Sequence, residues 1–243
     1  TVLPATRRLI KEISVNATSA SPADARAGAP HADTASPTRR VLDAPTRAFH
    51  WLMAFSFLGA FITADGERFR LVHVTLGYTL AGLVAWRVLW GLLGPRPVRL
   101  GVWLGKLRGL RGLVDVIQAG RWPLQAAQNV AQAAAVLGLL AAGVLVTASG
   151  YALYAELAGG RWEDALEEVH EFLGNGMLAL VLAHIGLVLA GSLLRRQNQA
   201  LTMVTGRAPG KGPDLAKRNL LPLGLLLLIC VISFWVWQWQ AVR

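Results

Sequence analysis

The sequence predicts an all-α integral membrane protein, a helical bundle of four core helices followed by a fifth transmembrane helix near the C-terminus. The first observation is composition: 54% of the residues are hydrophobic and the mean hydropathy is +0.44, whereas soluble domains are roughly 45–50% apolar. The second is that the apolar residues fall into runs of about 20, the length that a helix needs to cross a bilayer. The third is that histidines lie in or beside these runs, where ionisable side chains are costly and usually functional.

Charge and cysteine content exclude two classes of protein. The formal net charge is +10, but the basic residues lie between the apolar runs and form no continuous amphipathic surface. We therefore expect them to orient the chain in a membrane and not to bind nucleic acid. The single cysteine, Cys230, lies inside an apolar run. It excludes an intramolecular disulfide and a C-x-x-C-H covalent haem attachment, so any haem would be held by coordination alone.

Residues 1–40 are rich in Ala, Ser, Thr, Pro and Arg and contain no apolar run. Such a segment cannot bury enough apolar surface to fold, so we predict a disordered, basic N-terminal extension. His31 falls within it, and we expect this side chain to be solvated and without a function.

Two predicted spans follow, residues 43–64 and 71–93. Asp43 is a suitable cap for the first helix, and Pro45 stands in its first turn, where a missing N–H does no harm. His50 lies near the start of the first span and His73 near the start of the second. Because only a short turn joins the two helices, they must be antiparallel, which places these two histidines near opposite membrane surfaces.

Residues 95–128 are less apolar and carry six bases against one acid. Apolar residues recur there at roughly helical spacing, which predicts a helix lying in the membrane interface; they are Leu104, Leu107, Leu110, Leu113, Val114 and Ile117. A third span, residues 131–154, is rich in small residues that permit close helix contact or leave room for a bulky cofactor. It contains no histidine.

The predicted helix of residues 164–195 carries two histidines, His170 and His184, fourteen residues apart. Fourteen residues fall about 40° short of four turns and rise about 21 Å, so both imidazoles leave one face at two depths in the bilayer. The alternative is that each is an unrelated polar residue packed between helices. A fifth span, residues 219–239, ends in Trp235, Trp237 and Trp239, which are typical of interfacial anchors.

The distribution of charge predicts the orientation. The N-terminus and the connections after the second and fourth spans are basic, whereas the connection after the third span is acidic, so the N-terminus should be cytoplasmic and the C-terminus periplasmic. This topology brings His73 to the depth of His170 near the outer surface, and His50 to the depth of His184 near the cytoplasmic surface.

Two neutral imidazoles on facing helices can supply both axial ligands of a haem iron, which suits electron transfer because no open coordination position remains. Metal binding without porphyrin is the alternative for the same histidines. Two histidines alone make a poor zinc or iron site, but three carboxylates near His170 keep that alternative open for the outer pair; they are Glu167, Glu168 and Glu171.

Three stretches resemble the bacterial cytochrome b561 family, which includes the b-type cytochrome subunit of nickel–iron hydrogenases. They are LDAPTRAFHWLMA, HVTLGYTLAGLVAWRVLWGLLGPRPVRL and EVHEFLGNGMLALVLAHIGLVLAGSLLRRQNQALTMVTGR, in the order of the family. The resemblance covers residues 41–208 and implies a four-helix core with two haem b groups. Carried over residue by residue, the iron ligands are His50, His73, His170 and His184. Residues 209–243, a linker and an additional transmembrane helix, lie outside it.

One departure from the family is visible. Many relatives have a Gly-His-Asn-Pro pattern just before the third helix, whereas this chain has Ala127-Gln128-Asn129-Val130. Arg47 and Arg87 are predicted near the cytoplasmic ends of their helices, where a bidentate guanidinium would suit a haem propionate; contact with lipid headgroups is the alternative. Aromatic residues that would pack on porphyrin, or merely between helices, are Tyr78, Trp51, Trp86 and Trp90.

The resulting hypothesis is a di-haem cytochrome of the bacterial inner membrane that passes electrons between a periplasmic redox partner and the quinone pool of a respiratory chain. The resemblance implies ubiquinone or menaquinone, since no local motif identifies a quinone site. The acidic connection favours a basic partner such as a c-type cytochrome. Two alternatives remain: an oxidoreductase acting directly on a small molecule, as in superoxide:quinone oxidoreductases, and a haem-bearing membrane anchor subunit of a hydrogenase-like complex.

Overall fold

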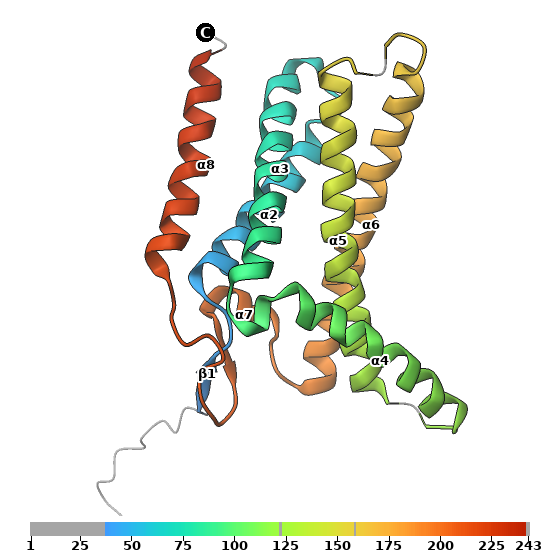
Figure 1. The fold of residues 1–243 in the computed structure, drawn as a ribbon, viewed down its shortest axis with the longest axis vertical. Coiled ribbons are helices and arrows are strands. Elements are labelled where there is room, and N and C mark those ends of the chain that lie inside the picture. Colours follow the sequence, from blue (N-terminus) through green and yellow to red (C-terminus); the bar gives the residue numbers. More distant parts are fainter. Residues whose placement is uncertain (1–36, 122, 158, 242–243) are drawn as a thin grey trace, which may run out of the picture. The chain divides into compact units, whose positions relative to one another are not determined.

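The computed structural model describes residues 37–121, 123–157 and 159–241, and long helices make up most of it (Figure 1). The helices that follow the predicted spans are α2 (Ala44–Ile62), α3 (Arg70–Leu93), α5 (Leu124–Tyr154), α6 (Glu163–Arg195) and α8 (Leu221–Ala241). Shorter elements connect them: η2 (Glu67–Phe69), η3 (Arg96–Val98), α4 (Leu100–Gln118) and α7 (Ala200–Thr205). The predicted all-α fold is confirmed.

Four of the described helices are long and apolar enough to cross a membrane: Glu67–Leu93, Leu124–Tyr154, Glu163–Arg195 and Leu221–Ala241. The protein is therefore a helical membrane bundle. Helix α2, the first predicted span, is not among the four, because Thr46, Arg47 and His50 lower the hydropathy of its first two turns. It nevertheless lies beside α3 and α8 (Figure 1), and its crossing stays a prediction.

Helix α2 begins and ends as its sequence dictates. The carboxylate of Asp43 accepts a hydrogen bond from the Thr46 amide at 3.1 Å, which confirms the predicted cap and satisfies one of the amides that the first turn leaves free. At the other end the Thr63 hydroxyl donates to the Gly59 carbonyl at 2.7 Å. Other carbonyls of this last turn remain available to side chains from elsewhere in the bundle.

The core forms where the four helices α2, α3, α5 and α6 meet. Each contributes one buried side chain to a single cluster, and these are Phe57, Leu80, Val146 and Met177. Because the cluster joins all four helices, it sets their depth relative to one another, and the histidines lie on either side of it along the helix axes.

Helix α8 packs against α2 and α3. Val231 is buried with Phe49 and Leu83, and Nε1 of Trp235 donates a hydrogen bond to the Thr79 hydroxyl at 2.8 Å. Trp235 therefore packs inside the bundle, because its indole N–H donates to a hydroxyl group on α3. It is not the interfacial anchor that the sequence predicted. Trp237 is 61% exposed and Trp239 54% exposed.

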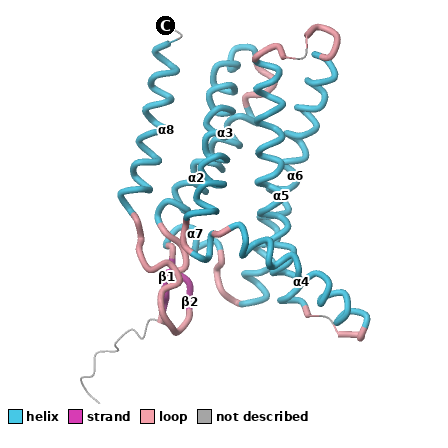
Figure 2. Tube along the Cα trace, in the orientation of Figure 1, coloured by secondary structure: helices cyan, strands magenta, loops and turns pink. Residues whose placement is uncertain are grey.

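A two-stranded antiparallel ribbon joins the segment before α2 to the segment after α7 (Figure 2). Strand β1 (Thr38–Arg40) pairs with β2 (Arg207–Pro209). The prediction that disorder extends through residue 40 is thus wrong for residues 38–40, because their partner strand lies far away in the sequence. The rest of the predicted extension, residues 1–36, lies outside the described residues.

Helix α4 is inclined across the end of α5 and does not run parallel to it (Figure 1), as an interfacial helix would. Nζ of Lys106 lies 4.1 Å from the centroid of the Trp103 ring, a cation–π contact. Burial, and secondly the positive charge of Arg195, lower the pKa of Lys106.

Helix α5 begins seven residues before the predicted span, because the Ala- and Gln-rich stretch preceding it favours a helix without being apolar.

Candidate functional site

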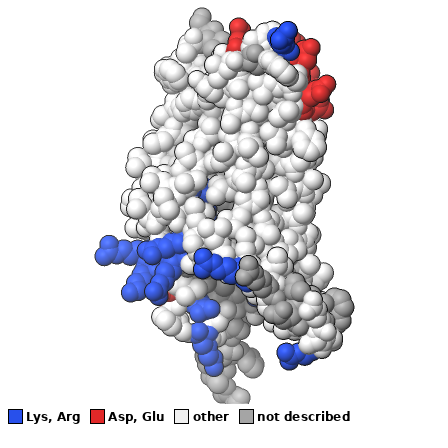
Figure 3. Space-filling view, turned by 45° about the vertical axis from the view of Figure 1, so that its right-hand side comes forward, with Lys and Arg blue, Asp and Glu red and all other residues white. Residues whose placement is uncertain are grey.

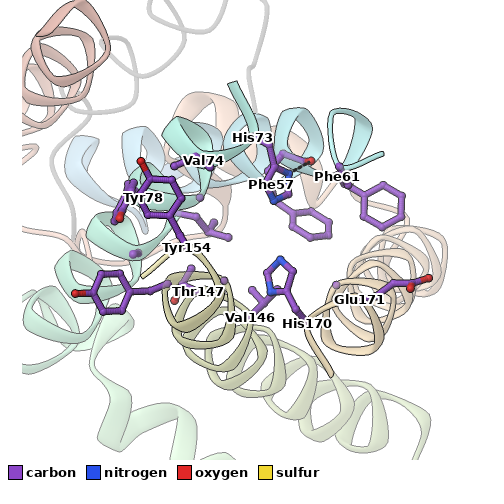
Figure 4. Close-up of a pocket in the computed structure, with 18 of the residues that line it drawn as sticks. Phe57, Phe61, His73, Val74, Tyr78, Val146, Thr147, Tyr154, His170 and Glu171 are labelled. Carbon is purple, nitrogen blue, oxygen red and sulfur yellow. Dashed lines mark hydrogen bonds between the residues drawn. The ribbon is translucent and has the colours of Figure 1, made fainter. Parts of the chain in front are cut away.

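His73 on α3 and His170 on α6 face each other across a cavity of about 460 Å³ (Figure 4). Their ring centroids are 6.2 Å apart and the ring planes are inclined at 85°. All four core helices contribute to the wall, which is mainly apolar near the histidines and includes Phe57, Phe61 and Val146. The structure thus brings together the outer pair that the sequence predicted.

The Nδ1 atom of each imidazole ring has a hydrogen-bond partner in the wall of the cavity. Nδ1 of His73 lies 2.8 Å from the carbonyl of Ala60, one of those in the last turn of α2. Since a carbonyl only accepts, His73 must donate from Nδ1, which leaves Nε2 unprotonated. Nδ1 of His170 lies 2.9 Å from the Ser149 hydroxyl.

This geometry fits two axial ligands of one metal. Metal–nitrogen bonds of about 2.0 Å, together with the size of the imidazole ring, place the centroids of two opposed ligands roughly 6 Å apart. An edge-to-face ring pair has similar spacing, but that arrangement alone explains neither the adjoining cavity nor the orientation of His73 Nδ1 away from it. The residues present therefore fit a haem at this level.

A glycine makes room for one of the rings. A methyl group on Gly150 would lie 2.8 Å from Cε1 of His170. Real Cβ atoms do not approach this closely, so any larger residue would displace the imidazole. The small residues of this span predicted room for a cofactor, but no pattern in the sequence distinguishes this position from the others.

His50 and His184, the predicted inner pair, each lie seven residues from the core residue of their own helix, Phe57 and Met177 respectively, which places both at the same depth beside the core cluster. Nδ1 of His184 lies 3.1 Å from Nε2 of Gln132 on α5. Within the described part of the chain, several buried polar atoms of this region have no hydrogen-bond partner; they include His50 Nδ1, Trp86 Nε1, Arg87 Nη1 and Trp90 Nε1. Buried polar groups are normally paired, so these orphaned atoms fit a polar cofactor or its substituents.

The two predicted arginines differ in their surroundings. Arg87 is fourteen residues after His73, so it lies on the same face of α3 about 21 Å deeper, at the level of the inner pair. Its guanidinium is buried and donates to the Val98 carbonyl at 3.0 Å. Arg47 donates to the carbonyl of Val204 at 2.7 Å and to the side chain of Asn219 at 3.5 Å, and its buried Nε has no partner among the described residues.

The aromatic residues form two groups. Trp86 and Trp90 stack on one face of α3, with centroids 5.5 Å apart and planes at 10°. Tyr78 makes edge contacts with Tyr151 and Tyr154 at 6.4 and 6.0 Å, and all three line the outer cavity. Trp51 donates to the Met203 carbonyl at 3.4 Å.

Charges of opposite sign gather at opposite ends of the bundle (Figure 3). Three carboxylates, Asp65, Glu167 and Glu171, line the outer cavity. Among the residues that the structure describes, no group of three or more His, Cys, Asp or Glu side chains is arranged to hold a metal ion. The alternative of a zinc or iron site built from His170 and neighbouring carboxylates therefore gains no support.

No pattern in the sequence predicted the polar residues that contact Nδ1 of the histidines, above all Ser149 and Gln132. Both lie on α5, the helix without histidines. Gln125, Gln128 and Gln132 recur at helical spacing, but this spacing does not indicate which of them meets a histidine. Only the register of α5 against α6 reveals which of them meet a histidine.

The fold and the site define a class of protein: a membrane helical bundle that encloses histidines at two depths between its helices. Residues 41–206 match the family described as prokaryotic cytochrome b561, and the chain belongs to this family. The protein is thus a b-type cytochrome of a bacterial membrane that binds haem b and takes part in electron transfer. The match confirms the resemblance seen in the sequence. No curated protein and no solved structure matches the chain.

Proposed function

We propose that this protein holds two haem b groups, one between His73 and His170 and one between His50 and His184, and conducts electrons across the membrane. The facing pair of His73 and His170 carries the proposal, since its spacing and perpendicular planes suit opposed ligands. Haem held by two imidazoles has no open coordination position and exchanges single electrons.

The inner pair extends the proposal to a second level. His184 follows His170 by fourteen residues on one helix face, about 21 Å deeper. His50 lies at the same depth on α2, since it is seven residues from Phe57 of the core cluster as His184 is from Met177. Arg87, at the same depth on α3, has one buried guanidinium nitrogen without a partner among the described residues. A haem propionate would satisfy it. The same role for Arg47 is part of the proposal.

Haem content tests the proposal directly. We expect the purified protein to contain two b haems per chain by pyridine haemochrome, and each single His→Ala substitution at the four positions to remove one. His31→Ala is the matched control and should keep both haems. One haem per chain in the unaltered protein, or retention of both haems after His73→Ala, would overturn the assignment.

The charge around the outer cavity favours one kind of electron partner. The outer cavity is lined by Asp65, Glu167 and Glu171, and like charges would repel an anionic substrate such as superoxide. A basic soluble protein, such as a periplasmic c-type cytochrome, is favoured there. As the other exchange partner we assign the quinone pool, ubiquinone or menaquinone. This assignment rests on what membership of the cytochrome b561 family implies.

Docking at the acidic end has its own test. Replacing Glu163, Glu167 and Glu168 by Gln should slow haem reduction by a basic c-type cytochrome at low salt and flatten the salt dependence of the rate. Lys211→Gln, at the opposite end of the bundle, is the control. An unchanged salt dependence in the triple variant would place docking elsewhere.

A further inference from the structure

Helix α5 supplies no histidine, yet it contacts both histidines of α6. We propose that Ser149 and Gln132 on α5 are positioning residues, each of which fixes the tautomer of one histidine so that its Nε2 is free to bind iron. This inference rests on the proposed di-haem function. It assigns separate roles to two side chains: Ser149 acts on His170 in the outer site, and Gln132 acts on His184 in the inner site.

The direction of the hydrogen bond at Ser149 follows from its second partner. The Ser149 hydroxyl lies 3.1 Å from the Val146 carbonyl, to which it donates its single proton. The hydroxyl oxygen is then left to accept from Nδ1 of His170 at 2.9 Å. His170 therefore carries its proton on Nδ1, as His73 does opposite the Ala60 carbonyl, and both Nε2 lone pairs remain available for iron.

The amide of Gln132 leads to the same tautomer at His184. In the structure Nε2 of Gln132 lies 3.1 Å from His184 Nδ1, while the buried Oε1 has no partner among the described residues. Turning the amide over exchanges the two atoms without changing its shape. Oε1 then accepts from Nδ1–H of His184, which leaves His184 Nε2 free, while the Gln132 amide nitrogen takes the position where Oε1 has no partner among the described residues.

The two sites differ in how many ligands are held in this way. In the outer site both His73 and His170 have an Nδ1 acceptor. In the inner site Nδ1 of His50 has no partner within the described part of the chain, so Gln132 alone orients a ligand. Loss of Gln132 should therefore affect haem binding more than loss of Ser149 does.

Redox titration of the holoprotein, with each haem assigned through the single histidine variants, tests the proposal. An acceptor at Nδ1–H makes the imidazole more electron-donating and favours ferric iron. Ser149→Ala should therefore shift the outer haem alone toward the ferrous state, by on the order of tenfold or about 59 mV for one electron. Gln132→Leu should do the same to the inner haem alone and reduce its retention on the order of tenfold.

Substitutions that keep an acceptor separate this role from simple packing. Ser149→Thr should restore the outer potential, and Gln132→Glu should lower the inner potential below that of the unaltered protein, because a carboxylate is the stronger acceptor. Gln125→Leu is the matched control on α5, since Gln125 is exposed near the start of the helix and does not line the outer cavity, and it should move neither potential.

The outcomes separate the two proposals. If the unaltered protein holds two haems but Ser149→Ala and Gln132→Leu leave both potentials in place, or Gln125→Leu shifts them equally, the tautomer roles are wrong and the di-haem function stands. If the unaltered protein holds fewer than two haems, the di-haem function fails, and the inference fails with it.

Discussion

Gly150 imposes a steric constraint on the outer site. Because a Cβ there would lie 2.8 Å from Cε1 of His170, we expect Gly150→Ala to turn the imidazole away and abolish the outer haem while sparing the inner one. Haem quantification and reduced-minus-oxidised spectra measure this. Gly176→Ala, where a Cβ meets nothing within 4 Å, is the control and should keep both haems. Full outer-haem content in Gly150→Ala would mean that the ring does not occupy this position.

The two arginines differ in a way that redox potentials can measure. A buried positive charge near haem favours the reduced state, so Arg87→Leu should lower the potential of the inner haem, by on the order of 59 mV if the equilibrium shifts tenfold. Arg87→Lys keeps the charge and should shift it less. Arg47→Leu should have the smaller effect, because Arg47 is only half-buried whereas Arg87 is buried, and a charge nearer to water is screened more strongly. Equal shifts from Arg47→Leu and Arg87→Leu would contradict this distinction.

At the residue scale, the sequence predicted the outer histidine pair because helical periodicity and antiparallel connection are enough to calculate depth and face. It did not predict Ser149, Gln132 or Gly150. Their roles depend on how α5 is rotated against α6, which is decided by side-chain packing at Val146, Met177 and similar contacts. No local pattern in the chain encodes that rotation.

Among the elements, α8 adds a helix to the bundle through a few specific contacts. The Trp235 indole donates to Thr79 at 2.8 Å, and such a hydrogen bond contributes about 1 kcal/mol. We expect Trp235→Phe to lower the free energy of unfolding in detergent by about that amount. Thr79→Val should cost a similar amount, and the double variant should cost little more, since both remove the same bond. Trp237→Phe, at a largely exposed site, is the control; strictly additive losses would show that the bond is not made.

The sequence predicted the existence and order of the helices better than their limits. Helix α6 was expected at residues 164–195 and spans Glu163–Arg195, because acidic residues mark its start and apolar periodicity runs to its end. Helix α5 starts earlier than its apolar run, since helix propensity does not require apolarity. The ribbon of β1 and β2 could not be foreseen, because each strand has three residues and pairs only across more than 160 positions of sequence.

On the scale of the whole molecule, the acidic end and the basic end define one axis (Figure 3). The histidine pairs lie along this axis at two levels, on either side of the core cluster. The core cluster of Phe57, Leu80, Val146 and Met177 belongs to the same four helices that carry or orient the histidines. The packing that stabilises the bundle therefore also sets the spacing of the two histidine pairs, so substitutions that change packing near Met177 should alter both proposed haem sites together.

The orientation of that axis in the membrane is a separate prediction. Basic residues favour the cytoplasmic side, so the acidic end at Glu163 should face the periplasm and the basic end at Lys211 the cytoplasm; both side chains are exposed. In a Cys230→Ala background, which removes the chain's single cysteine, Glu163→Cys should react with a membrane-impermeant maleimide in cells whose outer membrane is permeabilised. Lys211→Cys should react only after the inner membrane is opened. The Cys230→Ala protein itself should remain unlabelled. Labelling of Lys211→Cys before Glu163→Cys would reverse the orientation, and would assign the site of the basic redox partner to the cytoplasmic side.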